Sequence, residues 1–305
     1  MAIASHIRSL VLPVAMAAAL LGHSLFARLY PIAPYLVFTI LFINYTAIDV
    51  RQMRPKRMDL QLMAFQVAFA VACYLAARAA LPAHDALAHG LLVTALTPVA
   101  ASSVVVSCAL GAKRETVTTY TILDNLLIAA AAPVIFAAIN HQGAAHILPN
   151  IWHIFRRIFP QIVLPFVVAL LLQHFLPRAN AAVGKAKGAT LYVWALALTV
   201  VLGKTFHDIV ARPSKPWGLM AAMLALCVAQ CATLFWAGKR IGARHGERVA
   251  GGQELGQKNT SFGVWMAVEF LNPLSAISLA AYSICQNLFN SWEMYQHDKK
   301  HLPET

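Results

Sequence analysis

The segment from Gly251 to Trp265 concentrates side chains that could bind or move a charge. It reads GGQELGQKNTSFGVW, so a carboxylate at Glu254, an ammonium at Lys258 and several side-chain amides lie within a few residues of one another. Such groups can hold a cation, an anion or a proton, and they do so most strongly away from water. The chemistry of this segment therefore depends on whether it lies in a loop or inside a membrane.

The composition indicates a membrane protein. Hydrophobic residues make up 59% of the chain, charged residues make up 12%, and the mean hydropathy is +0.64. A soluble domain carries about 25% charged residues. Apolar runs near the roughly 20 residues needed to cross a bilayer recur along the chain. We predict an all-α integral membrane protein with ten transmembrane helices, at about 9–27, 31–49, 58–80, 86–111, 115–138, 158–177, 188–206, 216–238, 250–271 and 273–295.

The Glu254–Lys258 pair is predicted to lie at membrane depth. The two residues could form an ordinary helix-surface ion pair in a loop, worth a few tenths of a kcal/mol. However, the apolar segment that follows, Thr260 to Leu271, is too short to cross a bilayer alone. The pair must then belong to the crossing, where ionisable groups are costly and usually functional.

Two of the ten predicted crossings contain helix-breaking residues. The fourth contains TPVAASS, in which Pro98 removes a backbone donor near mid-membrane, and the ninth contains Gly251, Gly252 and Gly256 around Glu254. The breaks are five crossings apart, and an odd number of crossings repeated once must insert the second time upside down. We therefore predict one transporter domain, residues 1–305, built as an inverted 5+5 repeat of about 9–138 and 158–295. Paired broken helices that cross near the midplane are typical of secondary transporter sites.

The distribution of basic residues predicts the orientation. If the N-terminus is cytoplasmic, the cytoplasmic segments hold more than twice as many Lys and Arg as the opposite side. This bias favours a multi-pass protein of the inner (plasma) membrane with both termini cytoplasmic. It also accounts for most of the net charge of +12, so we expect the lipid bilayer as a partner and not nucleic acid. Residues 140–157 are polar and aromatic enough to predict an interfacial helix.

The two broken segments carry a resemblance to a known family. In the bile acid:sodium symporter family the fourth helix has a Pro-Gly-Gly-x-x-Ser-Asn motif, and here residues 98–104 read PVAASSV. The ninth helix of that family has Glu-x-x-x-Gln-Asn, and residues 254–259 read ELGQKN. The chain resembles the bacterial ten-helix members over essentially its whole length. The resemblance implies a panel of helices, a core that includes the broken ones, and a small organic anion as substrate.

The resemblance also implies roles for individual residues. Ser103 and Thr121 match hydroxyl ligands of one sodium site, and Glu254 matches the carboxylate that bridges this site to a second. Gln66, in AFQVAF, resembles the third-helix glutamine of the second site. Asn259 matches the asparagine at the helix crossing, beside the substrate cavity.

Two departures from the family motifs bear on the coupling ion. Val104 stands where the family has an asparagine, and Lys258 stands where it has a glutamine. A valine supplies no oxygen ligand, and like charges about 4 Å apart cost roughly 4 kcal/mol at an effective dielectric constant near 20. We expect Lys258 to act as a built-in cation that offsets Glu254, so that a proton or uncoupled exchange replaces two sodium ions. Asp124, one turn after Thr121, either shares this site or pairs with a neighbouring helix.

Four residues near the two breaks are expected to face a substrate cavity. They are Pro98, Asn259, Thr260 and Ser261, because a crossing of broken helices leaves amides that an anion can use.

Three other functions stay open. They are a sodium-coupled symporter of the bile-acid type, an arsenite-type efflux carrier, and a membrane assembly or structural protein. Neither break carries the cysteine that a thiophilic substrate would favour.

An enzyme is not expected. The sequence contains no HExxH, no GxSxG and no glycine-rich phosphate loop. The chain is expected to have no cofactor beyond a coupling ion, sodium or proton, and no confident metal site. Nothing in the sequence points to an obligate protein partner.

Overall fold

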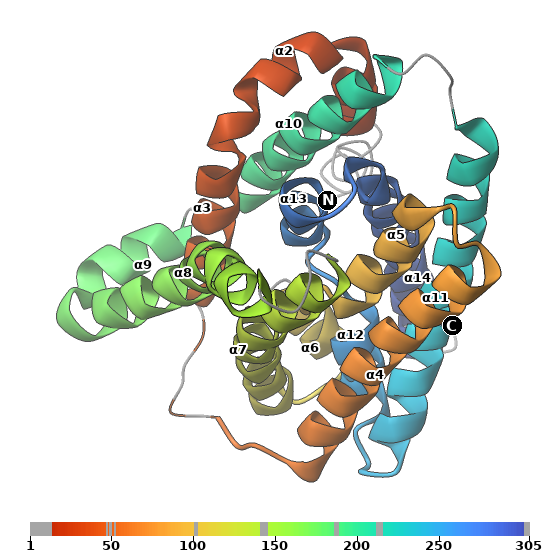
Figure 1. Ribbon diagram of the computed structural model, residues 1–305. Helices are drawn as coiled ribbons and strands as arrows, with labels where there is room; N and C mark the ends of the chain where they lie inside the picture. The colour runs from red at the N-terminus through yellow and green to blue at the C-terminus, as the bar shows by residue number, and fades with distance from the viewer. Residues whose placement is uncertain are drawn as a thin grey trace.

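The computed structural model describes residues 14–46, 48, 51, 53–100, 103–140, 146–185, 189–211 and 216–301, and their regular structure is helical (Figure 1). One isolated antiparallel bridge joins two extended residues. The elements are α2 (His23–Leu29), η1 (Tyr30–Ile32), α3 (Ala33–Tyr45), α4 (Arg57–Ala80), α5 (Asp85–Leu96), α6 (Ser103–Ala109), α7 (Arg114–Ile139), α8 (Ile147–Phe175), α9 (Pro177–Lys185), α10 (Thr190–Val210), α11 (Trp217–Ala243), α12 (Arg248–Gly256), α13 (Thr260–Phe270), η5 (Pro273–Ser275) and α14 (Ala276–His301).

Among the described residues, six helices are long and apolar enough to cross a membrane. They are His23–Tyr45, Arg57–Ala80, Arg114–Ile139, Ile147–Phe175, Tyr192–Val210 and Trp217–Ala243. They overlap the second, third, fifth, sixth, seventh and eighth predicted crossings. The fourth and ninth predicted crossings are each divided into two short helices, and the tenth is formed by η5 and most of α14. The all-helical membrane class is thus supported, with six spans that meet the criteria of length and hydropathy.

The boundary between the first two predicted crossings was wrong. A loop was expected near residues 28–30, but α2, η1 and α3 run together as one candidate span. Pro31 and Pro34 do not interrupt it, because each lies in the first turn of its element, where a missing N–H is not needed. A turn lies earlier, at Gly22, after helical residues 14–21. Residues 9–13 of the first predicted crossing lie outside the described residues.

The predicted interfacial helix was also wrong as a separate element. α8 is one helix of 29 residues that includes residues 147–157 and most of the predicted sixth crossing. Pro160 and Pro165 lie inside α8 without ending it. Residues 141–145 of the predicted interfacial helix lie outside the described part of the chain.

The helices form two groups. α2, α3, α8 and α10 pack on one another at the upper left of Figure 1, whereas α4, α5, α11, α12 and α14 pack together at the lower right. α13 lies between the groups and contacts α10, α3, α5 and α14. This division resembles the panel and core expected from the sequence, with α5 and α12, the first helix of each broken segment, in the core group.

Close packing of glycines holds α12 against α11. A Cβ atom added at Gly251 would lie 2.5 Å from the carbonyl oxygen of Gly238 and 2.8 Å from the Cα of Gly242. Small residues allow this approach of two helix backbones. Gly251 and Gly252 therefore lie inside α12 and do not break it, contrary to the sequence prediction. The helix ends only at Gly256.

Candidate functional site

Both predicted breaks are present. α5 ends at Leu96 and α6 begins at Ser103, while α12 ends at Gly256 and α13 begins at Thr260. Ala101 and Ser102 lie outside the described residues. A break in a buried helix releases backbone N–H and C=O groups that need partners where water is scarce.

The two breaks supply those partners to each other. Val99 and Lys258 form the isolated antiparallel bridge, and the Asn259 backbone N–H donates to the carbonyl oxygen of Pro98 at 2.8 Å. The two extended segments, residues 97–100 and 257–259, are called the helix crossing below. The predicted meeting of the fourth and ninth crossings is confirmed by this contact.

Lys258 is buried at the helix crossing. Its residue is 1% exposed, and its backbone is held by Gln286, which accepts from the Lys258 N–H at 2.8 Å and donates to the Lys258 carbonyl oxygen at 3.2 Å. The Nζ atom has no hydrogen-bond partner among the described residues. It forms no ion pair with a described acidic side chain, and Asp124 is the acidic group whose charge acts on it.

The expected pairing of Lys258 with Glu254 is not formed in this conformation. α12 ends between the two residues, and Gln257 has an extended backbone with ψ of 118°. The helical i,i+4 spacing that would bring the two side chains together is therefore lost. The charged groups that act on Glu254 are Asp59, Glu247, Lys56 and Asp124, and Lys258 is not among them.

Asp124 caps the backbone of the helix crossing. Its side chain is fully buried, and Oδ2 accepts a hydrogen bond from the Val99 N–H at 2.6 Å. Its Oδ1 has no hydrogen-bond partner among the described residues. Asp124 thus caps the broken backbone, and it forms no ion pair with Lys258 in this conformation.

Glu254 is the most isolated charged group of the core. It is 0% exposed, and neither carboxylate oxygen has a hydrogen-bond partner in the described part of the chain. An ionised carboxylate in such a place is strongly disfavoured unless a cation or proton accompanies it. The position suits a group that takes up and releases a positive charge.

The residues matched to sodium ligands make local contacts in this conformation. Thr121 Oγ1 donates to the carbonyl oxygen of Val117 in its own helix at 2.8 Å, and Ser103 Oγ has no partner among the described residues. Gln66 Nε2 donates to the carbonyl oxygens of Leu96 and Thr97, both at 3.3 Å, at the end of α5. Gln66 therefore supports the crossing through backbone contacts.

The predicted substrate residues are packed within the protein in this conformation. Asn259 is 8% exposed and caps α13 by accepting from the Phe262 N–H at 3.3 Å, while Thr260 Oγ1 donates to Ser283 Oγ at 3.3 Å. Ser261 is 1% exposed, and its hydroxyl has no partner among the described residues. An open cavity beside these residues stays a prediction for another conformation.

The comparison with known families decides the class of protein. The sequence model of the SBF-like CPA transporter family matches residues 10–283. The chain belongs to this family. A comparison with curated proteins finds no match. The resemblance to bile acid:sodium symporters is thus confirmed at the level of the SBF-like family, and the chain is a multi-pass membrane protein of a transporter family.

Sequence reasoning missed several contributors to the crossing of this SBF-like protein. Asn125 Nδ2 donates to the carbonyl oxygens of Thr121 at 2.7 Å and of Val99 at 3.4 Å. The Tyr282 hydroxyl donates to the Gly256 carbonyl oxygen at 2.6 Å, where α12 ends. The signal for Asn125 was its place directly after Asp124 in an apolar helix. Tyr282 gave no signal, because a tyrosine is common in a membrane helix.

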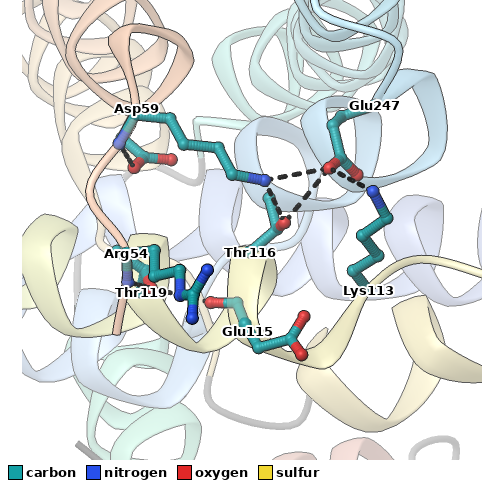
Figure 2. A network of polar contacts seen from close by, with 8 residues as sticks. Arg54, Asp59, Lys113, Glu115, Thr116, Thr119 and Glu247 are labelled. Carbon is teal, nitrogen blue, oxygen red and sulfur yellow. Dashed lines mark hydrogen bonds and ion pairs between the residues drawn. The ribbon is translucent and has the colours of Figure 1, made fainter. Parts of the chain in front are cut away.

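A second group of charged residues lies where α4, α7 and α12 begin (Figure 2). We call Lys56, Asp59, Lys113, Thr116 and Glu247 the Glu247 cluster. Lys56 Nζ donates to Thr116 Oγ1 at 2.6 Å and to Glu247 Oε1 at 2.9 Å, and Lys113 Nζ lies 3.7 Å from the same carboxylate oxygen. Asp59 Oδ2 accepts from the Lys56 backbone N–H at 2.7 Å.

The electrostatics of Glu247 follow from these contacts. Partial burial acts to raise the pKa of its carboxyl, but the hydrogen bond and charge of Lys56, with the charge of Lys113, hold the pKa below its usual range. The sequence did not predict this cluster, because its residues come from the starts of three helices that are far apart in the chain.

Proposed function

We propose that this protein is a secondary transporter that moves a small organic anion by alternating access and does not take up two sodium ions. The observation that carries the proposal is the burial of Lys258 at the helix crossing without a hydrogen-bond partner for its Nζ, in a core that also buries the carboxyl groups of Asp124 and Glu254. Membership of the SBF-like transporter family supports the transport class.

The anionic substrate class is supported by the charge of the crossing. Lys258 contributes a positive charge to the point where two helices are interrupted, and the following segment 259–261 offers polar side chains. Positive charge and polar groups at interrupted helices are the features that recognise an anion near the membrane midplane. A substrate carboxylate that entered here would compete with Asp124 for the charge of Lys258. Substrate binding would therefore be linked to the separation of Lys258 from Asp124.

The coupling mechanism is supported by the same residues. When a movement of the helices takes Lys258 away from the negative charge of Asp124, a buried ammonium without a counter-ion favours loss of its proton. The proton would return when the two groups approach each other again. Glu254 offers a second buried site that can be charged or neutral. Proton coupling, or exchange without a coupling ion, therefore replaces the two-sodium mechanism.

The proposed topology follows the sequence analysis. We propose that ten crossings form an inverted repeat within one domain, with the first crossing ending near the Gly22 turn, the repeats near 9–138 and 158–295, and both termini on the cytoplasmic side of the inner membrane. The juxtaposed breaks of α5–α6 and α12–α13 support this arrangement, because they occupy corresponding places in the two halves. Accessibility labelling of single cysteines placed near both ends of α9 and in the α11–α12 turn tests it.

The decisive experiment is flux in proteoliposomes. The purified full-length protein is supplied with a panel of labelled organic anions, with and without sodium and with and without a pH gradient. We expect uptake of at least one anion in sodium-free medium. Lys258→Gln should abolish the response to the pH gradient, and Lys204→Gln is the matched control, because Lys204 already binds both oxygens of Asp208 at 2.5 and 2.6 Å.

The remaining outcomes separate the alternatives. Sodium-stimulated transport by the native protein would instead support the bile-acid-type symporter. Sodium dependence that appears only in the double variant Val104→Asn/Lys258→Gln would support the interpretation that Val104 and Lys258 replace sodium ligands of the family. Flux of arsenite alone would support an arsenite-type carrier, and flux of no solute under any gradient would support an assembly or structural role.

A further inference from the structure

A basic cavity lies at the end of α11, away from the helix crossing. It has a volume of about 390 Å³ and is lined by Trp236, Lys239, Arg240, Ala243 and Arg248. The first four residues belong to the last two turns of α11, and Arg248 is the first residue of α12. Three of the five lining residues are cations, and none is acidic.

Two of these cations are available to an anion. Lys239 is already engaged, because it forms an ion pair with Glu293 and lies over the Phe289 ring at 4.8 Å. Arg240 and Arg248 are exposed, and neither forms an ion pair with a described acidic side chain. The Arg240 guanidinium stacks over the Trp236 ring at 5.2 Å, which fixes it at one wall of the cavity.

The surface beside the cavity is suited to a hydrocarbon chain. Leu224, Val228, Ala232 and Trp236 form an i,i+4 row of exposed apolar residues along α11, which is a candidate membrane span. The row leads directly to the cavity at the helix end. Exposed tryptophan and arginine at the end of a span are typical of the membrane–water interface.

We propose that this cavity binds the phosphodiester headgroup of an anionic membrane lipid, whose acyl chain lies along the exposed row of α11. Arginine is suited to the headgroup because its planar fork binds phosphate oxygens in a bidentate manner. Basic pockets between helices at the cytoplasmic side are a general means of lipid recognition. The positive-inside prediction places this end of α11 on that side.

The lipid would also connect two helices. Arg240 lies on α11 and Arg248 opens α12, so one headgroup bound by both would bridge the turn 244–247. α12 carries Glu254 and leads to the helix crossing. Bound lipid should therefore raise the thermal stability of the α11–α12 pair.

Native mass spectrometry and thermal unfolding of the full-length protein in neutral detergent test the proposal. The probes are phosphatidylglycerol, phosphatidylcholine with the same acyl chains, and inorganic phosphate. We expect phosphatidylglycerol to bind and to raise the unfolding temperature, and the other two to do neither at the same concentration. Arg240→Gln/Arg248→Gln should weaken phosphatidylglycerol binding roughly 25-fold, since each charge near an anionic headgroup contributes about fivefold.

Matched variants separate a cavity from a general surface charge. Arg244→Gln/Arg178→Gln removes the same charge from two exposed arginines that do not line the cavity, and it should change binding by less than half as much on a logarithmic scale. Trp236→Leu removes a cavity wall without a change in charge and should weaken binding several-fold, whereas Trp217→Leu at the other end of α11 should not.

Three results would overturn the proposal. They are equal binding of phosphatidylglycerol and phosphatidylcholine, equal loss in the two double variants, and binding of inorganic phosphate as tight as that of the lipid. The last result would assign the cavity to a soluble phosphate. None of these variants touches the helix crossing, so the outcome is independent of the proposed transport function.

Discussion

Two clusters in this protein use the same residue types in opposite ways. In the Glu247 cluster, Lys56 contacts both Glu247 and Thr116, and its side chain is 37% exposed. At the helix crossing, Lys258 is 1% exposed, and its Nζ has no hydrogen-bond partner among the described residues. Both clusters draw on α4, α7 and the α12 region, so the difference lies in partners and access to water.

The difference separates a structural role from a working one. Charges that are hydrogen-bonded and partly solvated hold helix ends together at little cost. Charges that are buried with unused hydrogen-bonding capacity lower stability, and membrane proteins retain them mainly where function needs them. The Glu247 cluster therefore holds three helix ends together. The helix crossing contains buried ionisable side chains that can change partners.

The largest expected effect is at the crossing. Asp124→Asn or Lys258→Gln alone leaves the other charge buried without a counter-ion, and we expect each to destabilise the protein by about 3–5 kcal/mol. The double variant Asp124→Asn/Lys258→Gln should recover most of that loss, because it leaves no net charge at this point. Denaturant unfolding in detergent measures all three. If the losses of the two single variants simply add, Asp124 and Lys258 do not act as a pair.

The position of the crossing depends on the fit between α12 and α11. In Gly251→Ala, the new Cβ would meet the backbone of Gly238 and Gly242, so we expect a loss of about 1–3 kcal/mol from the forced separation of the helices. Gly218→Ala on α11 is the control, since nothing lies within 4 Å of its added Cβ. A variant at Gly251 as stable as the control would mean that the two helices are not held at this distance.

The sequence predicted the broken helices for a clear physical reason. Pro98 cannot donate a backbone hydrogen bond, and glycines lower the stability of a helix interior, although of the three glycines named in the ninth crossing only Gly256 lies at the helix end. The contact between the two breaks was predicted from their spacing along the chain. Composition alone predicted the membrane class.

The sequence could not predict that a helix end separates Glu254 from Lys258. The i,i+4 spacing brings the two side chains together only while the helix continues, and the backbone becomes extended at Gln257, between them. The same limit applies to the glycines, because Gly251 reads as a break until its partner Gly238 is known. Long-range partners decide what a local pattern means.

The Glu247 cluster gives a smaller effect with a pH dependence. Glu247→Gln should cost about 0.5–1 kcal/mol, because partly exposed ion pairs contribute little. Since the pKa of Glu247 is lower in the folded protein, its contribution is present above the pKa of the unfolded chain and is lost as the pH falls through the folded value. Unfolding at neutral pH and at acid pH should show a difference between native and variant only at neutral pH. A loss comparable to that of Lys258→Gln would remove the contrast between the clusters.

The smallest effect is expected where the sodium-site resemblance predicts a large one. Ser103 Oγ is buried and has no partner among the described residues, so Ser103→Ala removes an unsatisfied group and should be neutral or slightly stabilising. If sodium bound there, the same variant would remove a ligand and weaken sodium-dependent flux strongly. Thr121→Val should cost about 1 kcal/mol in stability through its lost hydrogen bond to Val117, without a change in the sodium response. Flux measured over a range of sodium concentrations separates the two mechanisms, because only a ligand role makes a stable Ser103→Ala variant inactive. Unchanged transport would leave Asp124, Lys258 and Glu254 as the charged groups through which the crossing works.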